Sequence, residues 1–435
     1  MTFSIVLHQM HSEKLFDSLK GPGFNSPHLH QKMSGNNTYD VAVIGSGIVG
    51  LSVALNLQSQ NKKVLVIEKE DDVAKHQSGR NSGVIHSGIY YRPESLKSEL
   101  CIRGRELLLE YAEEKGINYK LSGKIIVDND IAKLKGLEDR ARELGLEGVR
   151  ILNESEMKEK EPNLLYKAGL LVPQAGVINY SVVSESLKED FINKGGAIVF
   201  HEEVTSIYNL SDSNGLTVGK KLKTKNSTYI ADYLINCAGL YSDSIAKLDG
   251  LKPSIKIIPF RGEYYIIRSK DKKLINSMIY PLSDPQLPFL GIHLTKTIDG
   301  EIEAGPNAVF AFAKEGYTWG TLNLSEFIGS VSFIGFWRLA SRYFVTGMGE
   351  MYRSLRRKKF LGEINKFVKD VSLEDLEPKN SGVRAQAVDK KGNLIDDFYF
   401  LEGSNALHVI NAPSPAATAS LAIAEHISSK INSES

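Results

Sequence analysis

The sequence has few cysteines, almost no net charge and no long apolar run, and each shortage excludes a class of protein. Only Cys101 and Cys237 occur among its 435 residues, so we expect neither a disulfide framework nor a metal site built on cysteines. A net charge of +1 gives no support for a nucleic-acid partner held by general electrostatics. No apolar stretch reaches the roughly 18 residues that a membrane-spanning helix needs. The composition, 42% apolar and 24% charged, is that of a globular protein, and the scarcity of cysteine suits a reducing compartment or an organelle matrix.

The first 38 residues contain no arginine and precede the first strand pattern without joining it. They are rich in histidine, serine, asparagine and glycine, and they include Glu13 and Asp17. We expect a removable or disordered leader here. A mitochondrial transit peptide is normally rich in arginine and poor in acidic residues, so this leader gives a mitochondrial address only weak support.

Two short basic clusters interrupt the otherwise balanced charge. They are KKLKTK at residues 220–225 and RSLRRKK at residues 353–359. Such clusters are usually solvated surface, but they also suit contact with an anionic membrane surface. Peripheral membrane contact therefore stays open as an alternative.

A nucleotide-binding pattern opens the globular part of the chain. The segment DVAVIGSGIVGLSVALNL, residues 40–57, begins as a buried strand and continues as a helix. Gly45, Gly47 and Gly50 lie between the two at the G-x-G-x-x-G spacing. Gly45 allows a tight turn, Gly47 keeps side-chain atoms away from a pyrophosphate, and Gly50 lets the helix pack closely on the strand. The helix N-terminus then faces the anion.

A second apolar strand follows in KKVLVIEK, residues 62–69, and contains Glu68 near its end. This acidic residue comes eighteen positions after Gly50, where a carboxylate typically accepts hydrogen bonds from ribose hydroxyls. Three glycines alone would also suit an ordinary turn. Together with the second strand and Glu68 they predict a dinucleotide site.

The rest of the chain predicts a mixed α/β fold whose nucleotide-binding elements are discontinuous. Strand and helix patterns continue to about residue 250, and a strand, a turn and a helix return at residues 406–427. Between them, residues 252–312 contain aromatic β-patterns such as PFRGEYYII, which predict an inserted antiparallel sheet. A Rossmann-like fold threaded through the whole sequence is more typical of flavoproteins than of simple nicotinamide dehydrogenases.

Six motifs carry a resemblance to a known family. In order from about residue 39 to about residue 427 they are DVAVIGSGIVGLSVA, GRNSGVIHSGIYYRPESLK, PFRGEYY, LPFLGIHLTKTIDGEIEAGPNAV, SGVRAQAV and INAPSPAATASLAI. Together they resemble the L-2-hydroxyglutarate dehydrogenases of the D-amino-acid-oxidase-like FAD proteins. The resemblance implies bound FAD, oxidation of L-2-hydroxyglutarate to 2-oxoglutarate and, in eukaryotic members, a mitochondrial address.

With this resemblance the chain divides into a leader and two domains. The leader is residues 1–38. The FAD-binding domain is expected at residues 39–120, 168–250 and 380–430, and the substrate domain at residues 121–167 and 251–379.

The loop GRNSGVIHSG, residues 79–88, lies against the flavin by resemblance. It offers Arg80, Asn81 and Ser82, with Gly79, Gly83 and Gly88 allowing close backbone approach. His86 in the same loop is either a flavin contact or an ordinary loop histidine, and the sequence does not separate the two.

A second flavin contact is expected from the turn between Asn411 and Thr418. Two prolines fix its backbone, and Ala416, Ala417 and Thr418 are expected to open a helix. The N-terminal amides of that helix would stabilise negative charge on the reduced flavin. An ordinary proline-initiated helix gives the same pattern.

Oxidation of a 2-hydroxy acid needs a hydride acceptor, a base for the hydroxyl proton and, for a dicarboxylate, fixed cations. Arg261 and Arg384 are the candidate cations, because arginine binds carboxylates bidentately and both lie in small-residue motifs; a structural ion pair is the alternative. His293 is the preferred base on the strength of the resemblance. An unperturbed histidine predicts a rate that rises with pH through about 6.5.

Two other functions remain compatible with the residues. A related flavoenzyme that oxidises glycerol 3-phosphate or an amine would use the same arginines. A flavin-binding or tRNA-modifying protein should show a broad basic face, for which the net charge gives no support. The electron acceptor, whether oxygen, a quinone or an electron carrier, is not determined by the sequence.

Overall fold

The computed structural model describes residues 37–268, 274–282 and 291–433. Most of the expected leader, residues 1–36, lies outside the described residues. Its last residue does not belong to a leader, because Thr38 is the first residue of strand β1 (Thr38–Ile44) and pairs with Ile230. The folded part of the chain therefore begins slightly earlier than the sequence suggests.

The first sheet has a parallel centre flanked by antiparallel strands. β1 is hydrogen-bonded on one side to β2 (Val64–Ile67) and on the other to β12 (Thr228–Asn236), and both pairs are parallel. β9 (Ala197–Val199) extends the sheet beyond β2, and β20 (Ala406–Asn411) lies beside the second half of β12. The antiparallel strands are β10 (Val204–Ser211), β11 (Thr217–Thr224) and β19 (Tyr399–Gly403). All four residues of β2 are buried, as its uninterrupted apolar sequence predicts.

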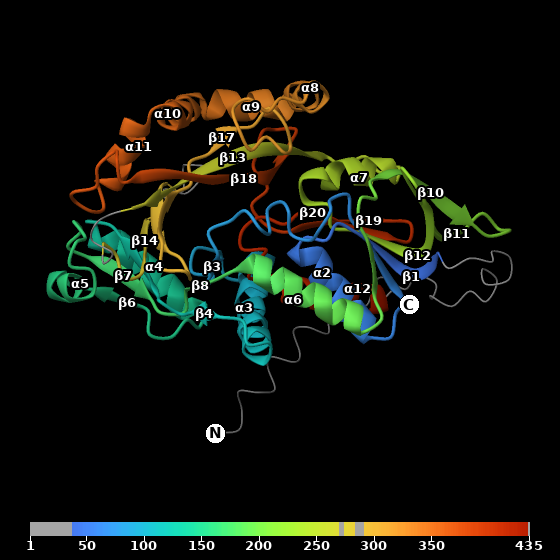
Figure 1. Cartoon of the computed structure of the whole chain (residues 1–435), viewed down its shortest axis with the longest axis horizontal. Coiled ribbons are helices and arrows are strands. Elements are labelled where there is room, and N and C mark those ends of the chain that lie inside the picture. Colours follow the sequence, from blue (N-terminus) through green and yellow to red (C-terminus); the bar gives the residue numbers. More distant parts are fainter. Residues whose placement is uncertain (1–36, 269–273, 283–290, 434–435) are drawn as a thin grey trace.

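Helices cover one face of this parallel centre (Figure 1). α2 (Ile48–Ser59) is apolar on most of its surface and packs against both α6 (Tyr180–Asn193) and α12 (Ser420–Ser433). α3 (Leu96–Glu114) packs on α12 and is capped at its start by Ser95, whose side chain accepts a hydrogen bond from the amide of Ser98. The first and last described helices thus lie together, which explains why the nucleotide fold needs both ends of the chain.

The second sheet is mixed but mainly antiparallel. Its strands run in the order β17 (Val309–Phe310), β13 (Ile255–Ile267), β16 (Ile302–Gly305), β15 (His293–Lys296), β14 (Met278–Pro281), β5 (Lys124–Val127), β7 (Gly169–Val172) and β6 (Arg150–Leu152), with β18 (Leu376–Asp389) also paired to β13. A small third sheet contains β3 (Val84–Ile85), β8 (Gly176–Ile178) and β4 (Tyr119–Lys120). The aromatic β-patterns of residues 252–312 supply strands of the second sheet, as the sequence predicts.

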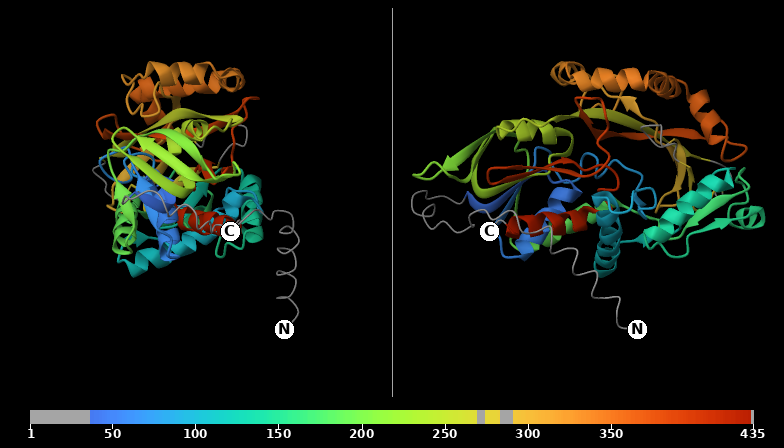
Figure 2. Two further views of the ribbon diagram at one scale, coloured as in Figure 1. Left: turned by 90° about the vertical axis from the view of Figure 1, so that its right-hand side faces the viewer. Right: turned by 180° about the vertical axis from the view of Figure 1, so that it is seen from behind.

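A layer of short helices lies on the outer side of β13, β17 and β18 (Figures 1 and 2). It consists of α8 (Leu324–Val331), α9 (Ile334–Arg342), α10 (Phe344–Leu355) and α11 (Arg357–Ile364). The remaining helical elements are α4 (Ile131–Glu143), α5 (Glu154–Lys160), α7 (Ser242–Leu248) and the 3-10 turn η2 (Gly239–Tyr241). Within the described ranges, no helix combines the length and apolar character needed to cross a membrane.

The mixed α/β fold with discontinuous segments is confirmed. The sheet to which each strand belongs bears on the expected domain boundaries at residues 168 and 380. β7 begins at Gly169 but pairs with β5 and β6 in the second sheet. β18 spans residue 380 and also belongs to the second sheet. The division into two domains at residues 168 and 380 stays a prediction, and sheet membership would move those boundaries by several residues.

Candidate functional site

The turn between β1 and α2 has the geometry of a pyrophosphate cradle. Gly45 has a φ of +99°, and a Cβ there would lie 2.7 Å from the carbonyl oxygen of Cys237. A Cβ on Gly50 would lie 2.0 Å from the carbonyl oxygen of Gly45. At Gly47, by contrast, an added Cβ meets only the Ser78 hydroxyl, at 3.2 Å. The backbone at Gly47, which precedes the first residue of α2, is therefore open to a ligand, and the residues present fit a bound dinucleotide.

Glu68 is tied to this turn by hydrogen bonds. Its Oε2 accepts hydrogen bonds from the backbone amide and the hydroxyl of Ser46, at 2.7 and 2.8 Å, and its Oε1 accepts one from the amide of Glu70 at 2.9 Å. These bonds hold the end of β2 against the glycine turn. A ribose contact by the remaining lone pairs stays a prediction.

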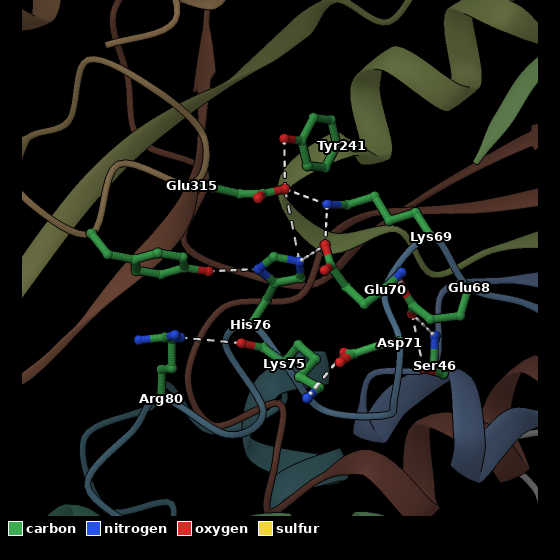
Figure 3. A network of polar contacts seen from close by, with 11 residues as sticks. Ser46, Glu68, Lys69, Glu70, Asp71, Lys75, His76, Arg80, Tyr241 and Glu315 are labelled. Atoms are coloured by element: carbon green, nitrogen blue, oxygen red, sulfur yellow. Dashed lines mark hydrogen bonds and ion pairs between the residues drawn. The ribbon is translucent and has the colours of Figure 1, made fainter. Parts of the chain in front are cut away.

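A polar network continues from Glu68 into the loop after β17 (Figure 3). The ammonium group of Lys69 pairs with the carboxylates of Glu70 and Glu315, and Tyr241 donates a hydrogen bond of 2.9 Å to Glu315. His76 lies 3.0 Å from Glu70 through Nε2. Glu70, His76 and Glu315 are close enough to share a metal ion, but the Lys69 ammonium already forms ion pairs with both carboxylates. This network joins the nucleotide turn to the second sheet and gives no reason to invoke a metal.

The loop of residues 79–88 is held by its own polar side chains. Arg80 donates to the carbonyl oxygen of Lys75 at 3.1 Å, and its guanidinium lies 4.0 Å from the centre of the Tyr317 ring. Asn81 bonds the carbonyl oxygen of Ser78 at 2.7 Å and the amide of Gly83 at 2.8 Å. Ser82 is half-buried beside them. Arg80 and Asn81 therefore shape the loop, and flavin contact by these residues stays a prediction.

The C-terminal turn lies against this loop, which joins two distant parts of the sequence. Thr418 Oγ1 accepts a hydrogen bond from the amide of His86 at 3.1 Å and lies 2.8 Å from the hydroxyl of Tyr180. Ala416 lies in a hydrogen-bonded turn, and α12 begins only at Ser420. The expectation that Ala416 to Thr418 open a helix is therefore wrong by about one helical turn, because residues 414–419 form turns first.

Asn411 ends β20 just before this turn. Its side-chain nitrogen donates to the carbonyl oxygens of Ile395 and Asp397, at 3.0 and 2.8 Å. Its side-chain oxygen is buried and has no hydrogen-bond partner in the described structure. A buried acceptor without a donor is uncommon in proteins, so this side-chain oxygen is available to a bound group or a water that donates a hydrogen bond.

Two histidines, His293 on β15 and His86 in the loop after β3, lie near each other, and His86 lies beside this turn. His293 on β15 is buried and stacks on Tyr280, with ring centres 3.9 Å apart. Its Nδ1 lies 3.2 Å from the carbonyl oxygen of Gly291, so Nδ1 donates and Nε2 keeps its lone pair. Burial lowers the pKa of His293 to about 3, and the charges of Lys124 and Arg384 act in the same direction. The pKa of an unperturbed histidine does not apply here.

His86 shares this environment. Its Nε2 lies 3.2 Å from the hydroxyl of Ser414. Burial lowers the pKa of His86 well below its usual value, and the charges of Lys124 and His293 add to the effect. Both histidines are therefore neutral near pH 7.

Sequence reasoning missed Lys124 and Tyr90, which line the same region. Lys124, the first residue of β5, is 1% exposed, and its Nζ lies 4.1 Å from the centre of the Tyr280 ring and 5.4 Å from that of Tyr90. Burial lowers the pKa of Lys124 to about 8. The Tyr90 hydroxyl is buried and has no hydrogen-bond partner among the described residues. The signal in the sequence was a lysine at the start of the apolar strand KIIV, because a charged residue in a buried strand indicates a functional role.

The two candidate arginines lie on different faces of the β13–β18 pair. Arg384 is paired with Phe260, and one of its terminal nitrogens lies 3.4 Å from the position of a Cβ on Gly262. Its charge acts on Tyr264, Tyr280 and His293, so it belongs to the histidine region.

Arg261 belongs to a separate buried network. It pairs with Glu263 at 3.1 Å, and its guanidinium lies 4.5 Å from the Trp319 ring. Glu263 in turn bonds Asn307 and the Ser354 hydroxyl on α10. Arg261 is therefore held in a structural ion pair, the alternative to a substrate-binding role.

Comparison with known proteins gives matches over nearly the whole folded part. A family model described as FAD dependent oxidoreductase matches residues 40–430. An L-2-hydroxyglutarate dehydrogenase of Indibacter alkaliphilus is 43% identical over 391 residues, covering 88% of this chain and 96% of its own. The mitochondrial L-2-hydroxyglutarate dehydrogenase of Homo sapiens is 39% identical over 419 residues, covering 92% of this chain and 90% of its own.

Among solved structures, the fold is shared with a flavoprotein. The FAD-bound L-α-glycerophosphate oxidase of Mycoplasma pneumoniae matches with a TM-score of 0.74, covering 91% of this chain and 95% of its own. Its sequence identity of 22% supports a common fold and nothing finer.

Proposed function

Because this chain belongs to the FAD-dependent oxidoreductases and, within them, to the L-2-hydroxyglutarate dehydrogenases, we propose that it oxidises L-2-hydroxyglutarate to 2-oxoglutarate. The observation that carries the proposal is the similarity to these enzymes over nine-tenths of the chain, joined to a buried site with two cations and two neutral histidines. When bound, FAD accepts the hydride from C2 of the substrate at flavin N5.

The residues around the histidines suit the other half of the reaction. As the hydride leaves C2, the hydroxyl proton must go to a base, and the carbon–oxygen bond becomes a carbonyl. We assign the proton to Nε2 of His293, because Nδ1 is already engaged with Gly291. Arg384 is assigned to a substrate carboxylate, since a planar guanidinium binds carboxylates bidentately.

Glycerol 3-phosphate is the nearest competing substrate, since an enzyme with a related fold oxidises glycerophosphate. The two hypotheses differ in what the cations hold: two separate carboxylates or one phosphate. The full-length sequence similarity favours the dicarboxylate. A direct comparison of substrates decides between them.

Anaerobic titration of the purified holoprotein tests this proposal. L-2-hydroxyglutarate is expected to bleach the flavin absorption bands, with release of one equivalent of 2-oxoglutarate. The D-enantiomer and glycerol 3-phosphate should leave the spectrum unchanged at the same concentration. Bleaching by glycerol 3-phosphate and not by L-2-hydroxyglutarate would replace the proposed substrate.

We further propose that the enzyme lies on an anionic membrane surface. Of the nineteen exposed large apolar side chains in the described part of the chain, eleven lie between Leu322 and Leu355, including Trp337 at 57% and Val345 at 84% exposure. We call this surface of α8–α10 the apolar helical face. Exposed basic residues, 356–359, adjoin it. An apolar face bordered by cations suits an anionic lipid surface.

The other basic cluster does not contribute to this face. Lys220 is buried and paired with Asp249, and β11 lies at the far end of the molecule from α10 and α11 (Figures 1 and 2). Only the cluster at residues 353–359 therefore supports membrane contact.

Cell fractionation tests the membrane proposal together with the mitochondrial address, which rests on mitochondrial relatives such as the human enzyme. The full-length protein is expected in the mitochondrial membrane fraction and to be released by high salt or alkaline carbonate. Changing Trp337, Phe344 and Val345 to serine should move it to the soluble mitochondrial fraction with flavin reduction intact. A cytosolic wild-type protein would refute the address, and a membrane-bound triple variant would refute the role of the apolar helical face. Replacing Leu121, Val182 and Leu216, which are exposed elsewhere, is the matched control.

A further inference from the structure

We propose that Lys124 and the hydroxyl of Tyr90 bind the C5 carboxylate of the substrate and so set the preference for a dicarboxylic over a monocarboxylic 2-hydroxy acid. This inference rests on the proposed oxidation of L-2-hydroxyglutarate. It assigns the second cation that a dicarboxylate requires, a role for which Arg261 is not placed.

Lys124 differs from the other buried lysines in what surrounds it. Lys97 pairs with Asp396 at 2.9 Å, Lys220 with Asp249 at 2.5 Å and Lys314 with Asp243 at 3.1 Å. In the described ranges, Lys124 instead meets the rings of Tyr90 and Tyr280 and has no carboxylate within ion-pair distance. A buried cation without an anion is costly unless a partner arrives from outside the chain.

A second, independent observation points to a ligand at the same place. The hydroxyl of Tyr90 is buried and unpaired in the described structure, although its ring lies beside the Lys124 ammonium. A carboxylate is the group that satisfies both, because it neutralises the ammonium and accepts a hydrogen bond from the hydroxyl.

The position of Lys124 relative to His293 favours the distal carboxylate. The Lys124 ammonium lies 4.1 Å from the centre of the Tyr280 ring, and the centre of the His293 ring lies 3.9 Å from it. Lys124 and His293 therefore contact the same tyrosine ring. His293 is assigned to the hydroxyl at C2. The C5 carboxylate lies three bonds from C2, and it is the group that a monocarboxylic analogue lacks.

Binding of product to the oxidised holoenzyme tests the assignment without turnover. We compare the dissociation constants of 2-oxoglutarate and 2-oxobutyrate, measured by perturbation of the flavin spectrum, in wild type, Lys124→Met, Lys124→Arg and the control Lys120→Met, which alters an exposed lysine. Lys124→Met should weaken 2-oxoglutarate binding about 10- to 100-fold and leave 2-oxobutyrate binding unchanged. Lys124→Arg should restore part of the loss, and Lys120→Met should match wild type.

Several outcomes overturn the proposal. Equal weakening of both ligands in Lys124→Met would mean a structural role, and unchanged binding of both would mean no role. If wild type itself fails to bind 2-oxoglutarate, the proposed function fails and this inference fails with it. If wild type binds 2-oxoglutarate and Lys124→Met prefers 2-oxoglutarate over 2-oxobutyrate by the same factor as wild type, only the role of Lys124 is refuted.

A pH profile provides a readout that remains if Lys124→Met does not fold. Burial lowers the pKa of Lys124 to about 8, so kcat/KM for L-2-hydroxyglutarate should fall as pH rises through this value and the ammonium loses its proton. Lys124→Arg should lack this fall, because a guanidinium stays protonated. An identical alkaline fall in Lys124→Arg would assign the titration to another group and count against the proposal.

The other titratable groups that face Lys124 leave this pH range clear. Burial raises the pKa of the Cys101 thiol on α3 to about 12 and raises the pKa values of Tyr90 and Tyr280. Burial lowers the pKa values of His86 and His293 far below 8. Among these neighbours only Lys124 changes charge near pH 8.

Discussion

Replacement of His293 by alanine is expected to slow anaerobic flavin reduction by L-2-hydroxyglutarate about 10²- to 10⁴-fold, the usual contribution of a positioned general base. The affinity for 2-oxoglutarate should change much less, because the base is needed only while the hydroxyl proton leaves. Stopped-flow measurement of flavin bleaching checks the rate, and spectral titration checks the affinity.

The pH dependence of this step should differ from that of an ordinary histidine. Because burial lowers the pKa of His293 to about 3, the neutral base is already present at pH 5 and gains nothing as pH rises. The reduction rate at saturating substrate should therefore show no step near pH 6.5, which the sequence led us to expect only of a histidine that burial does not perturb. A step near 6.5 that disappears in His293→Ala would mean that the bound substrate raises this pKa.

The control is His426→Ala, which alters a half-buried histidine that packs on Phe400 away from the site. Its reduction rate should match wild type. If His293→Ala reduces its flavin at the wild-type rate, the base is another group, and His86 is the next candidate because it is also held neutral in the same region.

Replacement of Gly47 by valine is expected to weaken FAD binding about 10²- to 10⁴-fold, which corresponds to the loss of two hydrogen bonds to a charged group. The folded protein itself should tolerate the change, because an added Cβ meets only the Ser78 hydroxyl, at 3.2 Å, a side-chain oxygen that also accepts a hydrogen bond from the amide of Ile48. The valine instead fills the space that a pyrophosphate would occupy in front of α2. Flavin content after gel filtration and FAD titration of the stripped protein measure the loss.

The matched control for this variant is Gly136→Val on the exposed side of α4, where an added Cβ meets no atom within 4 Å. It should keep a full complement of FAD. Full flavin content in Gly47→Val would contradict the cradle at this turn. An unfolded Gly47→Val protein would contradict the argument that the space is free.

The sequence predicted those features that depend on neighbouring residues along the chain. The strand, the glycine turn and the helix of residues 40–57 follow from local apolar periodicity and from backbone conformations such as the φ of +99° at Gly45. The motifs also predicted Arg261, Arg384, His86 and His293 as residues of one site. Arg384 and the two histidines lie in one region, whereas Arg261 pairs with Glu263 elsewhere, and the roles of these residues stay predictions. Local rules failed at residues 414–419, where a run of turns delays the helix to Ser420.

Properties set by contacts between distant segments required the tertiary structure. Arg261 and Arg384 lie in similar sequence motifs. In the structure, however, Arg261 is held by Glu263 and Trp319, whereas the charge of Arg384 acts on His293. Lys124 and Tyr90 come from different segments, yet the Lys124 ammonium lies 5.4 Å from the centre of the Tyr90 ring, and no carboxylate of the described residues forms an ion pair with Lys124.

By itself, therefore, the sequence determined the class of cofactor, the fold and the set of reactive residue types, because these follow from local pattern and family resemblance. Only the tertiary structure decided that Lys124 has no carboxylate partner among the described residues and that burial lowers the histidine pKa values. Both depend on burial and on charges brought together through space, as at His293 on β15, whose pKa is lowered by burial and by the charges of Lys124 on β5 and Arg384 on β18.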